Sequence, residues 1–187
     1  MFVLAGFEVG IVLQGQQRAD LSSREVALMF AECSVVMLCV NAFLFFTSLL
    51  EKVSARSLSV AGLILAMVGL AVMSQHRSEL WIYVGISLTA AGTGLLLPVI
   101  YYLAAGASRH TLGATMGGLA AAAGLGQTLG SSVGGWLFGA LAQRSFGLLI
   151  LPLVVMLVVL IAKPRWWPVG PAESTSRSTY VEAKRSP

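Results

Sequence analysis

The chain has 187 residues, of which 57% are hydrophobic and only 11% are charged, and its mean hydropathy is +0.83. A soluble domain carries about 25% charged residues, so this composition excludes an ordinary soluble protein and indicates a chain that lies almost wholly in a lipid bilayer. The net charge of +4 comes from basic residues scattered singly through connectors and tail, unlike the clustered pattern of a nucleic-acid-binding face. We therefore expect lipid as a partner and no nucleic acid.

Six apolar stretches separated by short polar connectors predict six transmembrane helices. The last five are near the roughly 17–25 residues that cross a hydrocarbon core. The first is short, so we expect a helix that is truncated or completed by residues upstream. The predicted spans cover residues 2–15, 25–47, 57–74, 80–105, 112–140 and 146–162. Residues 1–167 would form the membrane domain.

The two ends of the chain bear on its placement in a cell. No Lys or Arg precedes Arg18, so we expect no cleaved signal peptide. Alternate connectors carry a slight excess of basic residues on the side of the C-terminus, which predicts a cytoplasmic C-terminus in a bacterial inner membrane. Residues 168–187 are rich in Ser, Thr and Pro and are expected to form a disordered cytoplasmic tail.

Polar side chains sort the six spans into two kinds. Residues 60–73 of the third span and 146–162 of the sixth contain no polar side chain, while the other four spans contain several. Two helices with polar side chains are thus followed by one without, and this pattern occurs twice. It is typical of an inverted repeat in which the first, second, fourth and fifth helices line a water-filled cavity. The alternative is that two spans are uniformly apolar by chance.

Two glutamates inside the spans are the residues most in need of an explanation. Glu32 lies well inside the second span and Glu8 in the first, where a charged side chain costs about 2.5–3.5 kcal/mol on insertion scales. A protonatable or cation-binding group in a water-filled cavity would justify that cost; a hydrogen-bonded carboxyl packed in the bundle is the alternative. The candidates for a substrate or proton cavity are Glu8, Glu32, Asn41, Thr93, Tyr101, Gln127 and Thr128.

The fifth span carries glycines at four-residue spacing. Gly126, Gly130 and Gly134, with Gly135 beside them, would form a groove on one helix face. Small residues at this spacing let a second helix approach closely in lipid. We therefore interpret these glycines as a helix-packing motif.

Two motifs resemble those of the major facilitator superfamily. The loop after the second span, residues 47–56, is similar to that family's cytoplasmic loop signature, with Glu51, Lys52 and Arg56 keeping its acidic and basic character. In the fifth span, residues 130–135 resemble the Gly-Pro-x-x-Gly-Gly pattern of the family's drug/proton antiporters, with a serine where that pattern has proline. Glycines of the loop signature are also replaced, which weakens a subfamily assignment.

The resemblance implies an all-α integral membrane protein: the C-terminal six-helix half-bundle of a transporter, built as a 3+3 inverted repeat with its first helix truncated. Its expected function is movement of a small solute by alternating access, coupled to protons and directed to drug or metabolite efflux. The loop charges Glu51, Lys52 and Arg56 would act at a cytoplasmic gate. The expected partner is an N-terminal half or a second copy of the chain.

Two other functions compete with transport. A non-transporting fragment or structural membrane protein is one, because six helices alone give a cavity only one wall. A membrane-embedded enzyme is the other, but it needs catalytic groups at depth, and His76 and His110 both lie in connectors. We expect no enzymatic activity, no cofactor and no metal.

Overall fold

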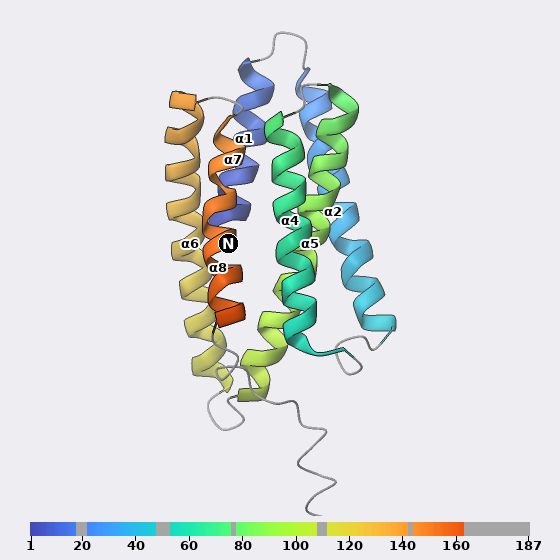
Figure 1. Cartoon of the computed structure of the whole chain (residues 1–187), viewed down its shortest axis with the longest axis vertical. Coiled ribbons are helices and arrows are strands. Elements are labelled where there is room, and N and C mark those ends of the chain that lie inside the picture. Colours follow the sequence, from blue (N-terminus) through green and yellow to red (C-terminus); the bar gives the residue numbers. More distant parts are fainter. Residues whose placement is uncertain (18–21, 48–52, 76–77, 108–111, 142–143, 163–187) are drawn as a thin grey trace, which may run out of the picture.

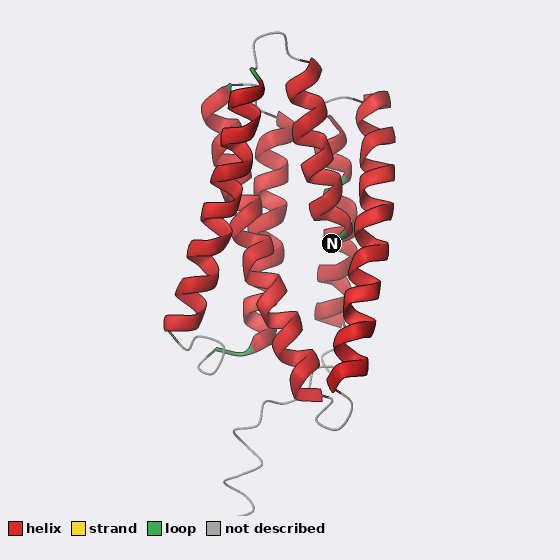
Figure 2. Ribbon diagram, turned by 180° about the vertical axis from the view of Figure 1, so that it is seen from behind, coloured by secondary structure: helices red, strands yellow, loops and turns green. Residues whose placement is uncertain are grey.

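The structure is a computed structural model that describes residues 1–17, 22–47, 53–75, 78–107, 112–141 and 144–162. Its regular elements within these ranges are all helices (Figure 2). They are α1 (Phe2–Gln17), α2 (Ser23–Phe46), α4 (Ala55–Gln75), α5 (Glu79–Ala107), α6 (Leu112–Leu141), α7 (Ser145–Leu148) and α8 (Ile150–Ala162). Only Leu149 separates α7 from α8, so the two form one rod and the bundle has six rods (Figure 1). The expected all-α, six-helix fold is confirmed.

Four of the rods are long and apolar enough to cross a membrane: α2, residues 80–106 of α5, α4, and the α7–α8 rod. The helix α1 is shorter, with 16 residues. The helix α6 has ample length at 30 residues, but its glycines and polar side chains lower its hydropathy. Length and composition thus agree with a membrane bundle in which two helices are adapted to something other than lipid alone.

Helix α2 begins at a capping box. The Ser22 hydroxyl accepts a hydrogen bond from the Glu25 backbone N–H at 3.4 Å, and the Glu25 carboxylate accepts one from the Ser22 backbone N–H at 2.6 Å. These bonds satisfy amide groups that the first helical turn would otherwise leave unpaired. The carboxylate of Glu25 therefore caps the N-terminus of α2.

Helices α4 and α5 are held together by glycines from both partners. A Cβ placed on Gly92 would lie 2.5 Å from the Gly62 carbonyl oxygen, and one on Gly69 would lie 2.6 Å from the Thr89 backbone nitrogen. Because backbone atoms cannot move aside as a flexible side chain can, only glycine fits at these crossings. This contact, and not the apolar character of the third span, sets where α4 lies.

Helix α1 packs on α6 in the same manner. A Cβ on Gly134 would lie 2.7 Å from the Gly6 Cα atom, and one on Gly130 would meet the Phe2 carbonyl group. Gly126 is less crowded, with the Phe2 nitrogen at 3.4 Å, and Gly135 would touch only a Val9 methyl at 3.9 Å. The structure therefore divides the predicted packing motif into two tight positions and two looser ones.

Aromatic rings close the end of the bundle where α1, α6 and α7 meet. The rings of Phe138 and Phe146 are 4.7 Å apart between centroids and nearly perpendicular, and Phe7 stands 6.3 Å from Phe146. All three side chains are fully buried. Edge-to-face packing of this kind adds about 0.5–1.5 kcal/mol per pair beyond the burial of area.

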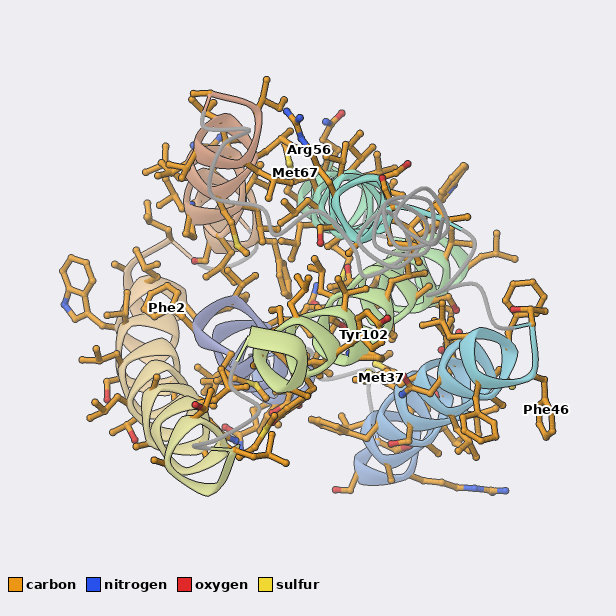
Figure 3. All side chains as sticks on the ribbon, turned by 90° about the horizontal axis from the view of Figure 1, so that it is seen from below. Phe2, Met37, Phe46, Arg56, Met67 and Tyr102 are labelled. Carbon is orange, nitrogen blue, oxygen red and sulfur yellow. The ribbon has the colours of Figure 1, made fainter. Side chains whose placement is uncertain are left out.

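Viewed along the helices, the rods form two layers (Figure 3). Helices α4 and α8 lie together on one side, near the labels of Arg56 and Met67, while α6, α1, α5 and α2 follow one another across the other side. The four helices of this row are those in which the sequence places polar side chains. The row defines the face on which a functional site can be built.

Candidate functional site: a buried glutamate between two helices

Glu32 lies where α2 packs on α5. Its Oε1 atom accepts a hydrogen bond of 2.6 Å from the hydroxyl of Ser87 on α5. Its Oε2 atom is buried and has no hydrogen-bond partner among the described residues. A buried carboxylate oxygen without a partner is costly, which makes Glu32 the leading candidate for a functional residue.

Two further groups approach Glu32 from its own helix and from α1. Cys33 is buried, and it interacts electrostatically with both Glu32 and Glu8. Glu8 is partly buried on α1. Within the described ranges neither carboxylate forms an ion pair with a lysine or arginine. The structure thus brings two uncompensated carboxylates to the same region of the bundle.

The described residues contain no group of three or more His, Cys, Asp or Glu side chains arranged to hold a metal ion. The chemical groups described in this region are two carboxylates, a thiol and a hydroxyl. Such a set suits a proton or an organic cation.

The two candidate threonines are used by their own helices. The Thr93 hydroxyl is buried and donates to the Thr89 and Ala90 carbonyls, and the Thr128 hydroxyl donates to the Gly124 carbonyl at 3.0 Å. Hydroxyls in membrane helices commonly bond the carbonyl four residues back. The hydroxyl protons of these threonines are already donated, which leaves only their oxygens as acceptors.

The remaining cavity candidates lie apart from Glu32. Asn41 is exposed on α2, Gln127 is exposed on α6, and Tyr101 is 41% exposed near the far end of α5. Tyr101 is 14 residues beyond Ser87, which corresponds to roughly 21 Å along the helix. Tyr101 therefore cannot form one compact site with Glu32.

Tyr101 borders a separate apolar cavity of about 230 Å³ between α5, α6 and the start of α1. Its walls are Met1, Phe2, Leu97, Ile100, Tyr101, Leu119, Ala122, Ala123 and Gly126. The phenol is the only polar side chain among them. The cavity is suited to an apolar group, and its walls carry no charged side chain.

Of the three predicted gate-loop residues, only Arg56 lies among the described ones. Its Nη2 atom donates to the Ile161 carbonyl oxygen at 3.3 Å, at the C-terminal end of α8. A cation there pairs with carbonyls that the helix leaves free and with the negative end of the helix dipole. Glu51 and Lys52 lie outside the described residues.

Sequence reasoning missed two features that position the site. Ser87 is one of several hydroxyls in the fourth span, and nothing in the sequence marks it as the partner of Glu32, 55 residues earlier. The α4–α5 crossing does leave a signal, because Gly62 and Gly69 are seven residues apart and so are Gly85 and Gly92. Paired glycines at helical spacing in neighbouring spans predict such a contact.

The six apolar rods and the partly buried carboxylates between them together define a polytopic α-helical membrane protein. A family model described as Major Facilitator Superfamily matches residues 4–186. The chain therefore belongs to the major facilitator superfamily, a family of membrane transporters. No curated protein and no solved structure matches it significantly.

Proposed function

We propose that this chain moves a small solute across the membrane by alternating access and that a proton taken up at Glu32 is coupled to the movement. The observation that carries the proposal is the buried, unpartnered Oε2 atom of Glu32. In a hydrocarbon environment such an atom is stable only when it can be neutralised. Glu8, on the neighbouring α1, is the second carboxylate in reach of the same positive charge.

The polar residues along the α6–α1–α5–α2 row support a cavity on this side of the bundle. Asn41 and Gln127 are both exposed, and lipid cannot satisfy an amide. We propose that they face water, solute or a facing set of helices. The partner would be an N-terminal half or a second copy of the chain, and the two would rock about the solute.

Reconstitution tests the function directly. The full chain would be placed in liposomes that contain a pH-sensitive dye, and a panel of cationic, neutral and anionic small solutes, drugs and metabolites among them, would be added outside. We expect at least one solute to change the internal pH, because movement of the solute is coupled to movement of a proton. If labelled solutes move without any pH change, proton coupling is wrong; if none moves, transport by this chain on its own is wrong.

We also propose that the protein lies in a bacterial inner membrane with its C-terminus in the cytoplasm, on the basis of the basic residues in its connectors. An alkaline phosphatase fused to the C-terminus is expected to be inactive in cells, and a fluorescent protein fused there is expected to fluoresce. Active phosphatase would reverse the orientation. The test is independent of the solute.

A further inference from the structure

Ser87 differs from the other hydroxyl groups of the bundle in its hydrogen-bond partner. The hydroxyls of Ser34, Thr89 and Thr128 donate to carbonyls of their own helices. Among the serine and threonine side chains that the structure describes, Ser87 is the one that donates to a side chain of another helix. That acceptor is the carboxylate at the centre of the proposed function.

The backbone contact between α2 and α5 keeps this pair in register. Gly94 lies seven residues after Ser87, on the same helix face, and a Cβ there would be 3.4 Å from the Met37 Cα atom. Met37 is five residues after Glu32. The two helices are therefore in close contact one or two turns from the Ser87–Glu32 bond, which leaves little freedom for the bond length to change without movement of a helix.

We propose that Ser87 is a positioning residue for proton binding: it holds the Oε1 atom of Glu32, so that the Oε2 atom stays directed into the bundle and free to take the proton. This inference rests on the proposed function. Cys33, the next residue on α2, interacts electrostatically both with Glu32 and with Glu8 of α1. Ser87 donates the hydrogen bond that the described residues provide to the Glu32 carboxylate.

The consequence for proton binding follows from the direction of the bond. A hydrogen bond donated to a carboxylate favours its ionised form. Without Ser87 the carboxylate loses that donor, so its ionised form is less stabilised. Ser87 thereby keeps the proton exchangeable.

Dicyclohexylcarbodiimide, an apolar reagent that modifies protonated carboxyl groups, tests this without any solute. The full chain in lipid nanodiscs would be treated over a range of pH, and the modification of Glu32 would be followed by mass spectrometry of its peptide. In Ser87→Ala we expect about tenfold faster modification at neutral pH, the factor that corresponds to one hydrogen bond to a charged group. At acid pH, where the carboxyl is protonated in every variant, the rates should converge.

Two variants separate positioning from a general structural effect. Ser87→Thr keeps a hydroxyl and should restore the wild-type labelling curve, and Ser34→Ala, which removes a hydroxyl that bonds only the Phe30 carbonyl, should leave the curve unchanged. Equal labelling of Ser87→Ala and wild type at all pH values would overturn the proposal. So would a rate increase that persists at acid pH, because it would indicate easier access of the reagent. A lack of transport in liposomes would refute the proposed function while leaving this measurement interpretable.

Discussion

Replacement of Gly134 by valine is expected to destabilise the bundle by about 1–3 kcal/mol, because it adds a side chain to a contact between two backbones. The Cβ atom alone would lie 2.7 Å from the Gly6 Cα atom and 3.1 Å from its carbonyl oxygen. Helix α1 would have to move away from α6, and Phe7 would then lose its contact with Phe146. The loss is measured by titrating purified protein in mixed micelles with sodium dodecyl sulfate and following its helicity.

The same helix provides the matched control. Gly139 is exposed, and a Cβ placed there would meet no atom within 4 Å. Gly139→Val makes the same chemical change five residues further along α6, so it should unfold at the wild-type concentration of detergent. Equal destabilisation by both substitutions would show that α6 is sensitive to valine in general, and the α1–α6 contact would then not be the cause.

The sequence predicts the helices well because their signals are local. A stretch of about 20 apolar residues bounded by polar connectors is read without knowledge of any other part of the chain. The expected six helices are found as six rods, and α1, with 16 residues, is the shortest of these rods. The apolar third and sixth spans lie together in one layer as α4 and α8 (Figure 3).

The sequence does not predict the hydrogen-bond and packing partners of individual side chains, because these depend on which helices meet and at what register. Thr93 is a reasonable cavity candidate by residue type, yet its hydroxyl donates within its own helix. A Cβ on Gly94 would lie 3.4 Å from the Met37 Cα atom of α2, a close approach that the sequence does not reveal. The Ser87–Glu32 bond follows from that contact, and periodicity alone could not have paired residues 55 positions apart.

Burial distinguishes the two glutamates of α2 in a way that residue type does not. Glu25 and Glu32 are seven residues apart and share a helix face. The carboxylate of Glu25 accepts two hydrogen bonds from Ser22 at the helix start, whereas Glu32 keeps one oxygen buried and unpaired. The carboxylate of Glu25 is therefore used by its own helix, whereas that of Glu32 is the one that we propose takes up a proton.

Glu32→Gln is therefore expected to lower solute-driven proton movement in liposomes by at least about tenfold, the factor that corresponds to one lost interaction with a charged group. Glutamine has nearly the same size, and its amide oxygen can still accept the Ser87 hydrogen bond, so folding should be retained. It cannot take up a proton. Internal pH would be recorded after solute addition, with circular dichroism as the check of folding.

Two further variants decide how the result is interpreted. Glu25→Gln keeps an amide oxygen for the capping box and should transport as the wild type does, which shows that removing a negative charge from α2 is not itself harmful. Glu32→Asp keeps the charge but is shorter by one methylene, so it cannot reach Ser87 in the same geometry and should retain only part of the activity. Wild-type proton movement in Glu32→Gln would remove Glu32 from the coupling mechanism. Because Glu8 is the other carboxylate that interacts with Cys33, proton coupling would then have to be sought on α1.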